Sequence, residues 1–179
     1  ETGNGLTFER DKRVAVWAKG ERVPWVELPG NGVVRRLKSR DGWAASWRRT
    51  MTRPRIGLPE SLEPAKNVPA GERLTAAELN LAPSRRTQVQ RGGISQARKT
   101  LRSFLRERGE PYQRAMSSPG PAWEACSRLS PYLAYGCVSM REVYQFTRDR
   151  VDLLESMAAR RPGSEGQWPV ALRAFEKRL

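Results

Sequence analysis

Prolines limit what the middle of this chain can form. Five of them fall at positions 54, 59, 64, 69 and 83, and no sustained apolar periodicity runs between them. Proline cannot donate a backbone hydrogen bond, and it biases the residue before it away from the helical region. A span this long without a regular element is uncommon inside a compact domain. We therefore expect residues 51–85 to be an interdomain linker, with at most a single helical turn over residues 75–79.

Near the N-terminus, the pattern predicts a helix. Over residues 8–19, Val14, Trp17 and Ala18 fall on a common face, and Gly20 follows as a stop signal. The remaining positions of this segment are mostly charged, as expected for a helix with one face toward solvent.

A short strand is predicted after that helix, over residues 23–28, with Pro24 near its start. Residues 29–32 carry a strong turn signal. Trp43 and Trp47 then stand at i, i+4 spacing in a stretch that we expect to be partly helical, and such pairs are usually packing pairs.

From residue 92 onward the chain reads as amphipathic helices. One apolar stripe, closed by Gly109 and Pro111, comprises Ile94, Ala97, Leu101, Phe104 and Leu105. Ser139 and Glu142 form a capping box, which predicts a helix over residues 140–158. Its expected inward side chains are Val143, Phe146, Leu154 and Met157. A helix break is predicted at residues 161–164. Another amphipathic pattern begins at Trp168 and continues to Leu179, so we expect a longer helical domain.

The charge of the chain points to a negatively charged partner. The net charge is +14, with +6 over residues 31–60, +5 over residues 91–120 and about +1 or less in each other thirty-residue segment. Arginine greatly outnumbers lysine, which suits bidentate contacts to phosphate. Neutralising phosphates releases counterions and drives nucleic-acid binding. A solvated basic surface is the alternative interpretation.

Several kinds of site are excluded by composition. The sequence has no histidine, so a histidine base or a histidine-ligated zinc cannot occur in it. Cys126 and Cys137 make neither a disulfide framework nor a metal motif. No run of about 18 apolar residues is present, as a transmembrane helix would need. We expect a cytoplasmic protein that binds no metal and no membrane.

Residues 126–136 carry the strongest chemical signal. Ser130 is predicted to cap a helix that has Pro131 at its first position and ends at Gly136. The free amides at such a start favour an anion, and the side chains of Ser127, Arg128 and Ser130 can add hydrogen bonds to a phosphate. An ordinary helix start is the alternative, because Ser-Pro is common there.

The same stretch resembles a known signature. Residues 127–142 are similar to the flavin-binding motif of the photolyase/cryptochrome family, which reads Thr-Ser-x-Leu-Ser-Pro-Tyr-Leu-x-x-Gly and then Ser-x-Arg. Upstream, the glycine pair and apolar stripe of residues 92–104, followed by Tyr112, resemble the helix and tyrosine that precede the motif in that family. The similarity covers residues 88–147.

The resemblance implies a mainly α fold with three parts. Residues 1–50 look like a remnant of the family's α/β antenna domain, with looser counterparts at 31–37 and 40–43 in the bacterial photolyase-like branch. Residues 51–85 are then the linker, and residues 86–179 are the N-terminal part of the helical FAD-binding domain. The flavin-ring pocket and the tryptophan chain of the family belong to the part of that domain that follows.

The resemblance also implies site residues. It assigns FAD as cofactor, with its diphosphate held by Ser127, Arg128, Leu129 and Ser130. Tyr112 matches a tyrosine near the flavin phosphates. Cys126 stands where the family usually has threonine, and a thiol is the weaker donor. Arg114 lies near an arginine that contacts DNA phosphate in that family.

The function so implied is light-driven repair of cyclobutane pyrimidine dimers in DNA. Such a lyase would act as a monomer on damaged duplex, with the lesion flipped out of the stack and the redox chemistry supplied by FAD. A cryptochrome-type photoreceptor is an alternative that this stretch does not separate from a lyase. A basic nucleic-acid-binding module without flavin is another. We expect the chain alone to be inactive, because it matches only the phosphate side of the site.

Overall fold

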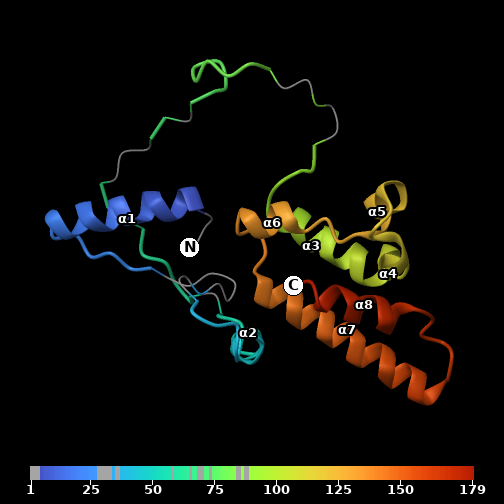
Figure 1. The fold of residues 1–179 in the computed structure, drawn as a ribbon. Coiled ribbons are helices and arrows are strands. Elements are labelled where there is room, and N and C mark those ends of the chain that lie inside the picture. The colour runs from blue at the N-terminus through green and yellow to red at the C-terminus, as the bar shows by residue number, and fades with distance from the viewer. Residues whose placement is uncertain are drawn as a thin grey trace.

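The described residues are mainly α. The computed structural model describes residues 5–27, 34, 37–57, 59–64, 66–67, 71–72, 74–83, 86 and 89–179. Over these ranges the chain forms eight α-helices, one π-helical turn and no strand (Figure 1). In order they are α1 (Gly5–Gly20), α2 (Trp43–Met51), α3 (Ile94–Ser103), the π-helical turn η1 (Phe104–Arg108), α4 (Tyr112–Ala115), α5 (Pro119–Ala125), α6 (Ser130–Ala134), α7 (Met140–Arg160) and α8 (Trp168–Glu176). None of these helices is long and apolar enough to cross a membrane.

The N-terminal region differs from its sequence pattern. Helix α1 begins three residues earlier than predicted and buries Ala18 together with Asp11. Trp17 is 58% exposed, so the expected apolar face is only partly used. The predicted strand is wrong over residues 23–27, which form no strand; strands need a paired neighbour, and the described residues supply none. Leu28 and the predicted turn at 29–32 lie outside the described residues.

Helix α2 packs on the N-terminal half of α7. Trp47 meets Tyr144 edge-on, with ring centroids 5.3 Å apart, and Trp43 stacks on Trp47 at 6.4 Å. The side-chain amide of Gln145 donates to the carbonyl of Met51 at 2.8 Å. The tryptophan pair is therefore a packing pair, as its spacing predicts.

The first residues of the predicted linker also contact α7. Arg141 donates to the carbonyl of Pro54 at 3.1 Å, and the Arg55 guanidinium lies 4.6 Å from the centroid of the Phe146 ring. Farther along, the amide of Leu79 donates to the carbonyl of Thr75 at 3.1 Å, which is the single helical turn that the pattern predicts.

The core lies between α3, η1, α4, α6, α7 and α8. Three aromatic rings meet edge-to-face at its centre, with Phe104 lying 5.6 Å from Tyr112 and 4.7 Å from Phe175, and Tyr112 lying 5.6 Å from Phe175. Offset and edge-on contacts are the favourable aromatic geometries. The apolar stripe predicted over residues 94–105 is buried except for Ile94, which is exposed at the start of α3.

Helix α7 begins where its capping box predicts. The Ser139 hydroxyl accepts from the amide of Glu142 at 3.1 Å, and the Glu142 carboxylate accepts from the amide of Ser139 at 2.9 Å. The helix runs two residues past its predicted end. Val143 and Leu154 are buried as expected, but Met157 is 44% exposed, because the last turns of α7 project past the core.

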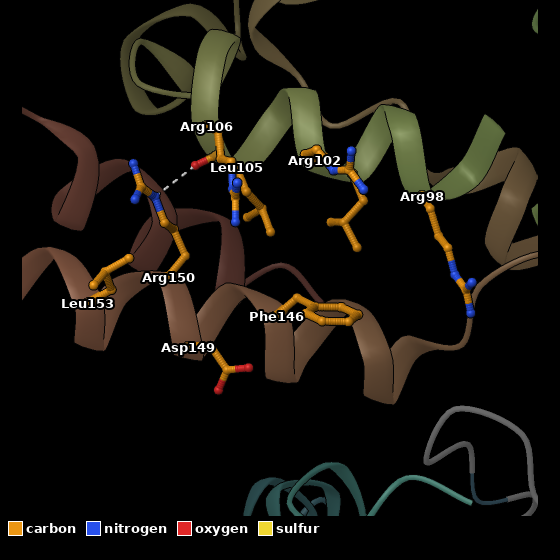
Figure 2. A pocket seen from close by; sticks show the side chains of 9 residues that line it. Arg98, Arg102, Leu105, Arg106, Phe146, Asp149, Arg150 and Leu153 are labelled. Atoms are coloured by element: carbon orange, nitrogen blue, oxygen red, sulfur yellow. Dashed lines mark hydrogen bonds between the residues drawn. The ribbon is translucent and has the colours of Figure 1, made fainter. Parts of the chain in front are cut away.

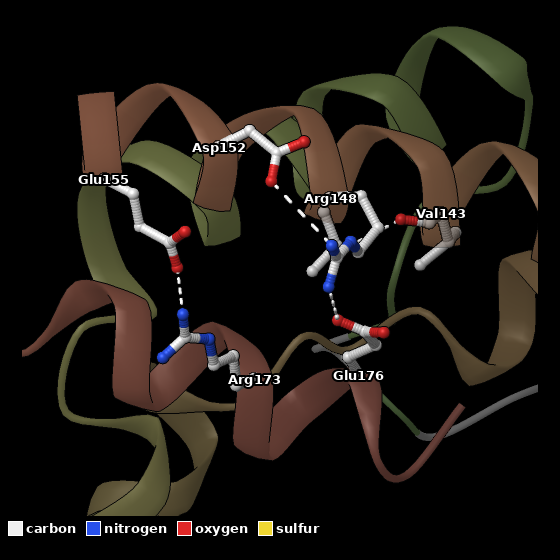
Figure 3. A network of polar contacts seen from close by, with 7 residues as sticks. Val143, Arg148, Asp152, Glu155, Arg173 and Glu176 are labelled. Carbon is white, nitrogen blue, oxygen red and sulfur yellow. Dashed lines mark hydrogen bonds and ion pairs between the residues drawn. The ribbon is translucent and has the colours of Figure 1, made fainter. Parts of the chain in front are cut away.

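Ion pairs join α7 to α8 at the surface (Figure 3). Arg148 lies 3.4 Å from Glu176 and 3.8 Å from Asp152, and Arg173 pairs with Glu155. Exposed pairs of this kind contribute at most about 1 kcal/mol each. The docking of α8 on α7 therefore depends mainly on its apolar face, which buries Ala171, Leu172 and Phe175.

A π-helical turn ends the α3 segment. The amide of Gly109 donates to the carbonyl of Phe104, five residues back, at 3.0 Å. A Cβ at Gly109 would lie 2.4 Å from that carbonyl oxygen and 2.9 Å from the Phe104 ring. Only glycine fits this approach, so Gly109 fixes the turn as well as ending it.

Replacing Gly109 with alanine should destabilise the fold. Because backbone and a core ring both oppose the new methyl group, we expect Gly109→Ala to lower the free energy of unfolding by about 1–3 kcal/mol in urea denaturation. Gly120→Ala is the matched control, since a Cβ at Gly120 in α5 meets nothing within 4 Å. Equal stability of the two variants would contradict the role assigned to Gly109.

Candidate functional site

The loop between α5 and α6 is held by its carbonyl groups. Arg108, at the end of η1, donates from Nη1 to the carbonyls of Glu124, at 3.1 Å, and Cys126. Its Nη2 donates to the carbonyl of Ser127 at 2.8 Å, and its Nε donates to the hydroxyl of Ser103 at 3.2 Å. The guanidinium of Arg108 thus donates to several backbone carbonyls of the loop. These hydrogen bonds orient the loop backbone.

The segment before α3 closes the other side of the loop. The side-chain amide of Gln90 donates to the carbonyl of Arg128 at 2.7 Å. The hydroxyl of Tyr132, on α6, donates to the carbonyl of Arg91 at 2.7 Å. Both contacts join residues about 40 positions apart in the sequence. The motif is therefore fixed from two sides, by Arg108 and by Gln90.

The amides of the same loop are left free. Within the part of the chain that the structure describes, the N–H groups of residues 127–130 donate to no acceptor, nor do the hydroxyls of Ser127 and Ser130 take part in a hydrogen bond. Arg128 has a φ of 57°, and Leu129 is right-handed, with φ −91° and ψ −14°. When left-handed and right-handed backbone conformations alternate in this way, successive amides point to one side and can form a concave anion-binding nest.

The electrostatics of the loop favour a negative ligand. Burial, together with the charge of Arg128, lowers the pKa of Arg108 to about 10, while Glu124 opposes the shift. The Arg128 guanidinium lies 5.1 Å from the ring centroid of Trp123, and its buried Nε has no hydrogen-bond partner in the described residues. Two guanidinium groups therefore lie at the loop, and a bound anion would relieve their mutual repulsion.

Ser130 is not the N-cap that the sequence predicts. The structure places Leu129 at the cap position and Ser130 at the first position of α6, with no side-chain capping bond. The correction follows from the backbone of Leu129, which is already right-handed helical. Helix α6 has only five residues, so the loop amides rather than a helix dipole must carry any anion binding.

The other predicted site residues are divided between core and surface. Leu129 is 1% exposed and belongs to the core, so its side chain is not available to a ligand. The Tyr112 ring is buried too, and burial raises the pKa of its phenol, while Arg178 lowers it. The Cys126 side chain is half-buried beside the loop. Arg114 is exposed on α4 and contributes nothing to the loop.

The sequence pattern does not predict the two residues that hold the loop. In the sequence, Arg108 looks like any other solvent-exposed arginine on a basic helix. Gln90 lies in a segment without apolar periodicity. A weak signal does exist for Arg108, since it immediately precedes the glycine that ends the helix, where a side chain can reach past the last turn.

No protein-family model, curated protein or solved structure matches the chain. The candidate function therefore depends on the motif and on the geometry of the loop. That geometry places unpaired amides beside two arginines, an arrangement suited to a phosphate or diphosphate group.

Arg108→Lys should release the loop without unfolding the chain. A lysine cannot reach the three carbonyls at once, because it lacks the planar fork. We expect faster amide hydrogen exchange over residues 124–130 and a loss of about 1–3 kcal/mol in unfolding free energy. Arg160→Lys is the control, since Arg160 is exposed at the end of α7. Unchanged amide hydrogen exchange over residues 124–130 in the Arg108 variant would contradict the role assigned to Arg108 in holding the loop.

Proposed function

We propose that this chain belongs to a flavin-dependent protein of the photolyase/cryptochrome type, in which the loop at residues 126–130 binds the diphosphate of FAD. The observation that carries the proposal is the run of unpaired amides over residues 127–130, together with the carbonyls of Ser127 and Arg128, which accept from Arg108 and Gln90. The residues of the loop are those through which the motif resembles the family's signature.

The residues present fit a diphosphate. Four consecutive amides, the hydroxyls of Ser127 and Ser130, and the guanidinium of Arg128 are all donors, and diphosphate oxygens are acceptors only. Donors already fixed by a folded loop bind with little loss of conformational entropy. When bound, FAD supplies one-electron redox chemistry. The role of this chain is to hold and orient the diphosphate.

The activity we propose is light-driven repair of cyclobutane pyrimidine dimers in DNA. The net charge of +14 supports a protein that must hold a nucleic-acid backbone, which a photoreceptor need not do. Arg114 is exposed on α4 and free to contact phosphate, as the resemblance implies. A cryptochrome-type receptor would use the same loop without the DNA contact.

A basic nucleic-acid-binding module without flavin is the second candidate function, and the net charge alone favours it. Visible flavin absorbance in the purified protein distinguishes the two, because only the flavoprotein retains the cofactor. A colourless protein that binds DNA would support the module.

Ser127→Ala should lower the flavin content of the full-length protein. Loss of a hydroxyl donor to a phosphate costs about 1–3 kcal/mol, so we expect occupancy after dialysis to fall about tenfold. Absorbance of released flavin per protein measures it. Ser117→Ala is the control, because Ser117 is exposed and lies outside the loop in sequence. Equal flavin content in both variants would count against the loop as the cofactor site.

The chain of 179 residues by itself should bind FAD weakly. Among the described residues, the loop offers donors to the diphosphate and no enclosed pocket for a ring system. We expect calorimetric titration to give a dissociation constant above about 100 μM, since one anion subsite supplies only part of the binding free energy. Tight stoichiometric binding would contradict this expectation.

A further inference from the structure

A second basic surface lies between α3–η1 and α7, away from the loop (Figure 2). It is an open cleft of about 390 Å³. Three arginines of the α3–η1 segment line one wall at four-residue spacing, and a fourth faces them from α7: Arg98, Arg102, Arg106 and Arg150. Cleft volumes of this order are typical of small-molecule sites.

The floor of the cleft is apolar. It is formed by Leu101, Leu105, Phe146 and Leu153. Leu101 and Leu105 are anchored in the core, so the floor is a fixed part of the fold. A ligand that fits here must therefore combine an apolar body with negative groups that reach the arginines.

The arginines of the α3–η1 wall are not neutralised by the protein. Among the described residues, Arg98, Arg102 and Arg106 take part in no ion pair. Asp149 is the one carboxylate of the cleft lining, and Figure 2 shows it pointing away from the arginine wall. The cleft thus carries an excess of three positive charges, counting four arginines against one aspartate.

The π-helical turn contributes a carbonyl that positions Arg150 in the cleft. The amide of Gly109 donates to the carbonyl of Phe104, five residues back, and the carbonyl of Leu105 accepts from Nε of Arg150 at 3.2 Å. Burial lowers the pKa of Arg150, and the charge of Arg106 lowers it further. The bond fixes Arg150 across the cleft.

We propose that this cleft binds a compact organic polyanion with an apolar or aromatic body, of which a nucleoside triphosphate is a representative. A second copy of the chain is a poor occupant, because it also carries a charge of +14. A long acidic peptide is disfavoured because the cleft has a volume of only about 390 Å³. The apolar floor accommodates the body, and the row of arginines binds the phosphates.

Calorimetric titration of the chain with ATP tests the proposal. We expect binding of one ATP per chain, weakened about tenfold or more in the double variant Arg98→Ala/Arg102→Ala, since each removed arginine deletes a charge-assisted hydrogen bond. Both side chains are exposed, so the variant should fold. Arg160→Ala/Arg161→Ala removes the same charge outside the cleft and should leave the affinity within about twofold.

Two further titrations distinguish binding in this cleft from binding to the α5–α6 loop or to basic surface in general. Inorganic tripolyphosphate should bind at least about tenfold more weakly than ATP, because it cannot use the apolar floor. Ser127→Ala should leave ATP affinity unchanged, whatever becomes of the flavin proposal. Equal affinity for tripolyphosphate, equal loss in the control double variant, or loss in Ser127→Ala would each overturn the cleft site.

Amide chemical shifts locate the bound ATP directly. In the unmodified chain, resonances of α3 and α7 should move when ATP is added, because these helices form the walls of the cleft. Shifts confined to other elements would also overturn the cleft site.

Discussion

The contact between Arg108 and the α5–α6 loop is the interaction on which the candidate site depends. Its guanidinium accepts no hydrogen bond and donates to the carbonyls of Glu124, Cys126 and Ser127. Carbonyl and amide groups alternate along a backbone, so fixing the carbonyls on one side leaves the amides for another acceptor. Burial and Arg128 together lower the pKa of Arg108, which means that its charge is held at a free-energy cost that an anion would offset.

The π-helical turn connects the two basic surfaces. It brings Arg108 to the loop, and it contains Leu105, whose carbonyl accepts from Arg150 across the cleft. Gly109 permits the turn because any Cβ there would meet the Phe104 carbonyl. π-helical turns inside helices frequently occur at functional sites. Here a single local irregularity positions donors for both candidate ligands, one in the loop and the other in the cleft.

The sequence predicts the parts of this fold that are locally determined. Helix periodicity depends on near neighbours, and the capping box at Ser139 specifies its own start, so the mainly α character and the core stripe follow from the pattern. The strand over residues 23–27 is wrong because pairing depends on a distant partner. Ser130 is displaced by one position from its predicted cap, since the backbone conformation of Leu129 is set by the loop. The contacts of Arg108 with the loop have only a weak sequence signal, because its carbonyl acceptors there are 16 to 19 residues away.

The central physical claim is that the amides of residues 127–130 form a preorganised concavity that binds an anion. Amide NMR of the chain during titration with inorganic pyrophosphate tests it most directly. Hydrogen bonding to phosphate oxygens should shift these four amide resonances downfield together and in a saturable manner, while amides of α8 stay in place. Saturable shifts that leave residues 127–130 unchanged, or no saturable shift at all, would contradict the claim.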